Sequence, residues 1–211
     1  MITVYGAFPT RSIRVMWALE ELGQDYQLHP VDLRNRMSDA EFIALNPCGF
    51  LPAMQDGDIA IVDSIAILEY LVARYDDKGL LAPSTADACF ADYQQFLHLG
   101  ESGLAAYLNI VVGSRFMAPE GEKDNFGARI AERMFENRLA LVTRQLDRAP
   151  MMAGERFSAA DISVVYALGM AERLGLAGKF GPEIADYRTR MEARPAYQRA
   201  NAKWTPPAKP A

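Results

Sequence analysis

The chain has 211 residues, of which half are hydrophobic, and a formal net charge of −5 at neutral pH. This length allows one large domain or two small ones, and the acidic balance excludes the strongly basic surface typical of nucleic-acid-binding proteins. Its apolar runs are too short to span a bilayer, and no charged leader precedes an apolar segment. The two cysteines and two histidines show no disulfide-framework or metal-ligand spacing. We therefore expect a soluble, cytoplasmic protein that binds no nucleic acid, membrane or metal.

The first part of the chain alternates strand and helix signals. The β-branched and aromatic run ITVYG at residues 2–6 predicts a strand. Residues 12–22 then carry the i, i+3, i+4, i+7 apolar spacing of an amphipathic helix, which ends at Gly23. Residues 25–33 predict a short second strand, and residues 39–46 predict a short helix.

A hairpin and a further helix follow. The runs LPAMQ and IAIV flank Asp56-Gly57, a typical hairpin turn, and apolar residues at helical spacing follow Ser64. The predicted order is strand-helix-strand-helix-strand-strand-helix. A strand-helix-strand unit gives a parallel pair and a hairpin gives an antiparallel one, so we expect a mixed sheet.

The second part of the chain is helical in its apolar period. Residues 74–88, RYDDKGLLAPSTADA, are charged and rich in breakers, and they predict a linker. We predict an α/β domain over residues 1–76, a linker over 77–83, and an all-helical domain over 84–211. Pro182 and Pro195 are typical first residues of further helices.

One helix start in the second part has the pattern of a capping box. In FSAADI, Ser158 is expected to cap the helix and Asp161 to accept a hydrogen bond from the Ser158 backbone. Phe157 and Ile162 are spaced as a hydrophobic staple. We therefore predict that Asp161 is buried and structural.

Two features of residues 49–71 indicate a site for a small charged molecule. Pro52 precedes a strand; a trans bond is the ordinary form, whereas a cis bond would leave the backbone of Leu51 free to pair with an extended peptide. Ser64 is a good helix N-cap, and the N–H groups and dipole behind it favour a carboxylate. The adjacent Asp63 can bind an ammonium group, so the two together fit an α-amino-carboxylate.

The segment NPCGFLPAMQDGDIAIVDSIAILEYL resembles the glutathione-binding core of cytosolic glutathione transferases. RVMWALEELG resembles the first helix of this family, and GERFSAADIS resembles its capping motif in the helical domain. The resemblance covers nearly the whole chain. It implies a thioredoxin-like domain followed by a C-terminal helical bundle domain, glutathione as co-substrate, and a homodimer with a role in detoxification.

The resemblance also implies roles for individual residues. Leu51 and the cis Pro52 would hydrogen-bond the cysteinyl backbone of glutathione, and Asp63 and Ser64 would hold its γ-glutamyl end. Many members of the family have Glu where Asp63 stands. Arg11 falls where beta-like members have their cysteine, and it would add positive charge near the glutathione sulfur instead.

The chemistry to be explained is activation of a thiol. A free thiol has a pKa of about 8.5, and a hydroxyl donor together with a helix N-terminus can lower it by a unit or two. The loop before the first helix, AFPTRS, offers Ser12 and Thr10 as catalytic hydroxyls, with Ser12 placed slightly ahead and also expected to cap the helix. Tyr5 is a third candidate, although a position inside a strand favours a core role.

We expect a glutathione transferase that joins the glutathione thiolate to a small hydrophobic electrophile. Tyr107, Phe116 and Tyr166 are candidates for lining the electrophile pocket, although aromatic residues at helical spacing usually belong to a core. The alternatives are a glutathione-dependent isomerase or dehalogenase, or a transferase-like binding protein without turnover. The zeta-type isomerase signature Ser-Ser-Cys is replaced here by Pro9, Thr10 and Arg11.

Overall fold

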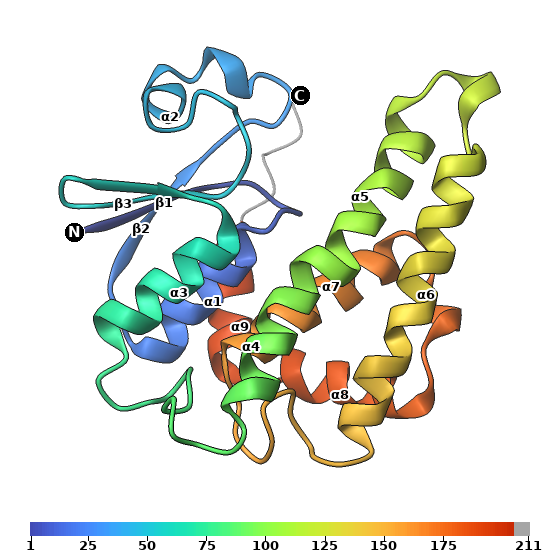
Figure 1. Ribbon diagram of the computed structural model, residues 1–211. Coiled ribbons are helices and arrows are strands. Elements are labelled where there is room, and N and C mark those ends of the chain that lie inside the picture. Colours follow the sequence, from blue (N-terminus) through green and yellow to red (C-terminus); the bar gives the residue numbers. More distant parts are fainter. Residues whose placement is uncertain (205–211) are drawn as a thin grey trace. The chain divides into compact units, whose positions relative to one another are not determined.

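The computed structural model describes residues 1–204 and divides them into two compact units (Figure 1). The N-terminal unit contains residues 1–81 together with the described residues from Glu192 onward, and the helical unit contains residues 82–191. The sequence-based division assigned everything after residue 83 to the helical domain. The structure differs in grouping the last helix with the N-terminal unit, and residues 205–211 lie outside the described part.

The N-terminal unit is built on a four-stranded sheet. Its strands are β1 (Ile2–Gly6), β2 (Tyr26–Pro30), β3 (Ala53–Asp56) and β4 (Ile59–Val62), in the order β2-β1-β3-β4. The pair β1–β2 is parallel, whereas β1–β3 and β3–β4 are antiparallel. This mixed sheet confirms the predicted thioredoxin-like topology. The predicted hairpin is present, but its two turn residues are Gly57 and Asp58, one position later than predicted, because Asp56 still pairs with Ile59.

Helices cover both faces of this sheet, because alternate residues of each strand point to opposite faces (Figure 1). On one face, α1 (Ser12–Leu22) packs against α3 (Ser64–Tyr75). On the other face, Tyr5 and Ala53 form a buried cluster with Phe42 of α2 (Ala40–Leu45), beside the 3₁₀ turn η1 (Arg36–Ser38).

The last helix, α9 (Pro195–Ala202), packs against α1. The Arg194 guanidinium binds both carboxylate oxygens of Glu21, with Nε–Oε1 and Nη2–Oε2 distances of 2.7 and 2.9 Å. Arg199 and Lys203 both pair with Glu20, at 2.7 and 3.1 Å. Opposite charges therefore join two helices that lie almost 180 residues apart in the sequence.

The helical unit confirms the all-helical prediction (Figure 1). Its elements are α4 (Phe90–His98), the π-helix η2 (Leu99–Ala105), α5 (Ala106–Val112), the π-helix η3 (Gly113–Met117), the 3₁₀ turn η4 (Glu120–Glu122), α6 (Phe126–Leu146), α7 (Ala159–Arg173), the 3₁₀ turn η5 (Ala177–Lys179) and α8 (Pro182–Glu192). Pro182 and Pro195 are first residues of α8 and α9, as predicted. No helix among residues 1–204 is long and apolar enough to cross a membrane.

The helix α7 forms the centre of this unit, because residues 159–171 are all buried. The predicted capping box is present at its start, where the Ser158 N–H donates to Asp161 Oδ2 at 2.8 Å. Asp161 has no exposed surface. It also accepts hydrogen bonds from the Met152 N–H at 2.9 Å and the Tyr187 hydroxyl at 2.7 Å. Asp161 is therefore a buried, structural carboxylate, as its spacing predicted.

Candidate active site

The strand register brings three separate segments to one edge of the sheet. Ala53 pairs with Val62 across the β3–β4 hairpin, so the residues just before Ala53 lie beside those just after Val62. Ala53 also pairs with Tyr5 of β1, so the loop that follows β1 starts at the same edge. The candidate residues of the AFPTRS loop, the Leu51–Pro52 pair and the Asp63–Ser64 pair are therefore neighbours in the fold.

The Leu51–Pro52 peptide bond is cis. This is the form that the family resemblance implies, and it differs from the trans form expected of proline in general. Leu51 is part-buried and lies just outside β3, and its backbone makes no hydrogen bond within residues 1–204. Its N–H and C=O groups can therefore pair with an extended peptide laid along this edge.

Asp63 and Ser64 exchange the roles that the sequence suggested. Asp63, not Ser64, is the N-cap of α3: its Oδ1 accepts from the N–H groups of Ile65 at 2.8 Å and Ala66 at 3.1 Å. Asp63 adopts a positive φ of 74°, which places its carboxylate over the helix end. Ser64 is the first helical residue and is buried. Asp63 thus occupies two helix donors that the sequence assigned to a ligand, and the Asp63 side chain remains exposed.

Arg14 is the neighbour of this pair that sequence reasoning missed. Its side chain has no exposed surface, and its Nη1 donates to Ser64 Oγ at 3.0 Å. Arg14 lies four residues before Ala18, which is buried in α1. Residues four apart lie on one helix face, so the apolar spacing of residues 12–22 was the available signal. A charged residue on a buried helix face usually has a specific partner.

The two hydroxyls of the loop form a chain. The Thr10 hydroxyl donates to the Ala7 carbonyl at 2.6 Å, and Thr10 Oγ1 lies 2.8 Å from Ser12 Oγ. Because a hydroxyl carries one proton, Ser12 is the donor to Thr10 in this arrangement. Ser12 has no exposed surface, whereas Thr10 is partly exposed. Thr10 is therefore the solvent-exposed end of this chain of hydroxyls.

Ser12 does not cap α1 as expected. The cap position belongs to Arg11, which makes no side-chain capping bond, and Ser12 is the first helical residue. Ser12 instead packs against Gly6. A Cβ at Gly6 would lie 2.7 Å from the Ser12 Cβ and 3.1 Å from the Trp204 ring, so a side chain at position 6 would displace the loop.

Tyr5 lies inside β1 and is buried, as its sequence position suggested. Its hydroxyl donates to Glu41 Oε1 at 2.6 Å, and its ring contacts His29, with 4.7 Å between centroids. Burial and then the Glu41 carboxylate raise the pKa of Tyr5 to about 12. A hydroxyl that is already committed to a carboxylate is a poor donor to a thiolate.

The three candidate pocket residues of the helical unit have different surroundings. Tyr107 on α5 is part-buried, and its hydroxyl accepts from Arg138 Nη2 at 3.0 Å. Tyr166 on α7 is buried, and Phe116 in η3 is 69% exposed. Phe116 alone has the large exposed apolar surface that an apolar molecule could cover.

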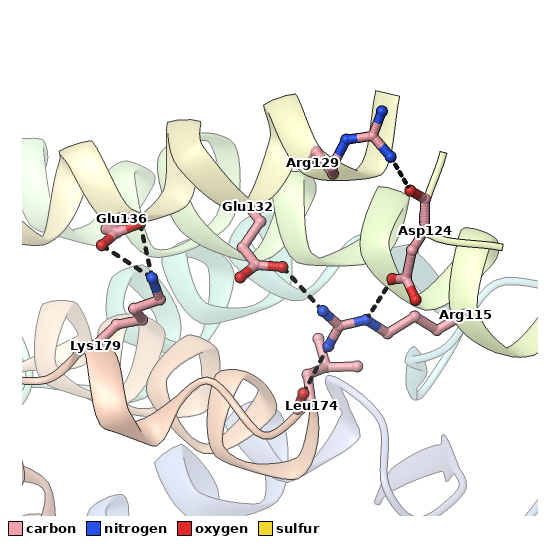
Figure 2. A network of polar contacts seen from close by, with 7 residues as sticks. All are labelled: Arg115, Asp124, Arg129, Glu132, Glu136, Leu174 and Lys179. Atoms are coloured by element: carbon pink, nitrogen blue, oxygen red, sulfur yellow. Dashed lines mark hydrogen bonds and ion pairs between the residues drawn. The ribbon is translucent and has the colours of Figure 1, made fainter. Parts of the chain in front are cut away.

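Figure 2 shows the polar network around Arg115, the residue that precedes Phe116 in the sequence. The neighbouring Arg115 donates from Nε to Asp124 at 3.0 Å, from Nη2 to Glu132 at 2.9 Å, and from Nη1 to the Leu174 carbonyl at 2.7 Å. One guanidinium thus joins η3 to the start of α6 and the end of α7.

Comparison with known proteins identifies the family. Residues 1–73 match the model of the glutathione S-transferase N-terminal domain, and residues 105–195 match that of the C-terminal domain. Glutathione S-transferase 3 of Zea mays is 30% identical, over 90% of this chain and 88% of its own. The chain belongs to the glutathione S-transferase family and is an enzyme of this family.

Solved structures agree with this assignment. A glutathione transferase from Methylococcus capsulatus str. Bath has a TM-score of 0.83 and is 28% identical, with 96% of this chain and 98% of that chain covered. The theta class glutathione S-transferase from Xanthomonas axonopodis pv. citri, solved with glutathione bound, has a TM-score of 0.76 and is 26% identical, with 94% and 96% covered.

Proposed function

We propose that this enzyme conjugates the thiolate of glutathione to a small hydrophobic electrophile, in the service of detoxification. The observation that carries the proposal is that the β3–β4 register places the Leu51–Pro52 pair beside Asp63 and Ser64 at one end of the sheet. The first feature offers free peptide groups to the cysteinyl backbone, and the second offers a carboxylate and a hydroxyl to the α-amino-carboxylate of the γ-glutamyl group. Glutathione carries both kinds of group.

Thr10 is proposed as the group that touches the sulfur. It is the accessible end of the hydroxyl chain, and the start of α1 behind it contributes positive potential. On binding, the Thr10 proton would turn from the Ala7 carbonyl to the thiolate while Thr10 still accepts from Ser12. A donor that itself accepts a hydrogen bond is strengthened by it. Ser12 thus supports Thr10 from a buried position, and no cysteine nucleophile is involved.

The test is the ionisation of bound glutathione. Thr10→Val should raise the pKa of the bound thiol by about one unit, which corresponds to ~1.4 kcal/mol and a roughly tenfold loss of turnover at neutral pH. Thr10→Ser, which keeps the hydroxyl, should behave like the parent, and Ser12→Ala should give a smaller shift. The loss should shrink as pH rises, because the thiol then ionises unaided.

The measurements are the thiolate absorbance of bound glutathione against pH and the turnover of a model electrophile. If Thr10→Val and Ser12→Ala both titrate like the parent, the hydroxyl assignment is wrong, and the N–H groups at the start of α1 become the better donors. Binding of glutathione without turnover of any chloro-, epoxide or enone electrophile would contradict the conjugation reaction itself. Phe116, the exposed member of the three candidates, is the proposed contact of the electrophile, and the part-buried Tyr107 and the buried Tyr166 are not proposed as contacts.

A homodimer is proposed as the working state. Phe50 is 74% exposed, and the edge strand β4 exposes Ile59 and Val62. We propose that a second copy of the chain covers Phe50, the most exposed of these apolar side chains. Sedimentation of the parent should give a dimer, and Phe50→Asp should shift it to monomer; a parent that sediments as a monomer would contradict this.

A further inference from the structure

Arg14 is a buried cation directly behind the proposed γ-glutamyl site. Its side chain and that of Ser64 are both almost fully buried, and the Arg14 Nη1 lies 3.0 Å from Ser64 Oγ. The two residues come from different helices, α1 and α3, and lie 50 positions apart in the sequence. A fully buried arginine is rare unless its charge is used or paired.

The direction of this hydrogen bond constrains Ser64. A guanidinium group only donates, so Ser64 Oγ must be the acceptor. The single proton of the Ser64 hydroxyl then points away from Arg14. It is left for another acceptor, and a carboxylate placed at the start of α3 is in line with the helix dipole.

Because Asp63 caps α3, fewer helix donors are left for a ligand carboxylate, and the Ser64 hydroxyl matters more for its binding. The N–H groups of Ile65 and Ala66 are already bound by Asp63 Oδ1. A ligand carboxylate at this helix end therefore cannot use these two donors while Asp63 caps the helix. The Ser64 hydroxyl, with the positively charged Arg14 behind it, is a donor at this helix end that an anion can still use.

We infer that Arg14 is a positioning residue for the recognition of the γ-glutamyl α-carboxylate: it holds Ser64 with its hydroxyl proton directed at this carboxylate and adds positive charge behind the bond. The inference rests on the proposed function. It assigns the two charged groups of the γ-glutamyl head group to different residues. Arg14 and Ser64 serve its carboxylate, and Asp63 serves its ammonium group.

The experiment compares glutathione with two analogues by titration calorimetry. One analogue, 4-aminobutyryl-cysteinylglycine, lacks the α-carboxylate; the other, glutaryl-cysteinylglycine, lacks the α-amino group. The parent should bind both more weakly than glutathione. In Arg14→Met, the preference for glutathione over the decarboxy analogue should fall about tenfold, the scale of one hydrogen bond to a charged group. Its preference over the deamino analogue should not change.

Matched variants give the contrast. Asp63→Asn should show the opposite pattern, with loss of the preference over the deamino analogue alone. We call the affinity for glutathione divided by that for the decarboxy analogue the decarboxy ratio, and the affinity for glutathione divided by that for the deamino analogue the deamino ratio. In a Ser64→Ala background, Arg14→Met should lower the decarboxy ratio less than it does in the parent, because the bond between the two residues is already gone and only the effect of the Arg14 charge is left to lose. Arg14→Gln, which can still donate to Ser64 but carries no charge, should fall between the parent and Arg14→Met.

The outcomes separate the inference from the proposed function. If the parent does not prefer glutathione to either analogue, the head-group site itself is wrong. If the parent prefers glutathione but folded Arg14→Met keeps the full decarboxy ratio, Arg14 is only a tie between two helices and the inference is overturned. If Arg14→Met does not fold, Arg14→Gln decides: an unchanged decarboxy ratio overturns the inference, and a reduced ratio with an unchanged deamino ratio supports it.

Discussion

Asp161 in the helical unit is a fully buried carboxylate. A carboxylate without solvent contact needs donors for its oxygens, and Asp161 accepts from two backbone N–H groups and from the Ser158 and Tyr187 hydroxyls. Burial raises the pKa of Asp161, and these four hydrogen bonds work against the rise. The residue therefore joins the start of α7 to α8 and to the loop at Met152.

We predict that Asp161→Ala will lower the free energy of unfolding by about 3–5 kcal/mol, more than a lost helix cap, because buried donors are left without an acceptor. Tyr187→Phe removes one donor and should lower it by about 1 kcal/mol. Urea denaturation of both variants checks this. Activity per folded molecule should be unchanged in both; a stable Asp161→Ala variant without turnover would make the residue catalytic instead.

At the scale of elements, Asp56 joins the hairpin to α3. It lies at the end of β3 and accepts from the hydroxyls of Tyr70, at 2.8 Å, and of Tyr75. The Tyr75 hydrogen bond is the main cause that lowers the pKa of Asp56 below its ordinary value of 3.8, with a further contribution from Tyr70. The folded state therefore favours the ionised carboxylate.

This shift predicts a pH dependence of stability. Because the folded pKa is lowered, the stabilisation is fully present above pH 3.8 and is lost as pH falls below that value, through the folded pKa. Asp56→Asn should be less stable than the parent at pH 7, and the difference should narrow below pH 3.8. Asp58→Asn, an exposed neighbour in the same turn, is the control and should follow the parent curve. A constant gap between Asp56→Asn and parent at all pH values would contradict the assignment.

The Arg115 network is the corresponding tie in the helical unit (Figure 2). We predict that Arg115→Ala will lower the free energy of unfolding by about 1–2 kcal/mol, a value reduced because the guanidinium is partly solvent-exposed. Arg115→Lys should recover less than half of the free energy of unfolding that Arg115→Ala loses. The lysine ammonium group cannot reach the three acceptors that the planar arginine guanidinium binds at once. Thermal unfolding monitored by circular dichroism checks both variants. Equal melting temperatures for Arg115→Ala and the parent would show that the network does not stabilise the fold.

For the whole molecule, ligand linkage offers a test that needs no substrate. Glutathione at about 100 times its dissociation constant should stabilise the protein by ~2.7 kcal/mol, which is a rise of several degrees in melting temperature. Ser64→Ala and Asp63→Ala should remove most of this rise. A full rise in both variants would place the ligand elsewhere in the chain.

Much of the fold could be predicted because its signals are local. The strand at ITVYG, the β3–β4 hairpin and the capping box at Ser158 each depend on residues within a few positions of one another. Periodicity, turn chemistry and capping act over such distances, so one sequence is enough to identify them. The order of these elements also predicts the mixed sheet, because connection length decides which strands are parallel.

The tertiary structure decided which role each residue of the site has. The exchange of roles between Asp63 and Ser64 depends on a positive φ, and the burial of Ser12 depends on its packing against Gly6. The bond between Arg14 and Ser64 spans 50 residues, and α9 reaches back to Glu20 and Glu21 of α1. Helical spacing indicated that Arg14 lies on a buried face, but the sequence does not show which distant residues meet, because each such contact depends on how the whole chain packs. The sequence alone determined the elements and the types of residue at the site; only the packing of the folded chain decided which of them faces solvent and which supports another from behind.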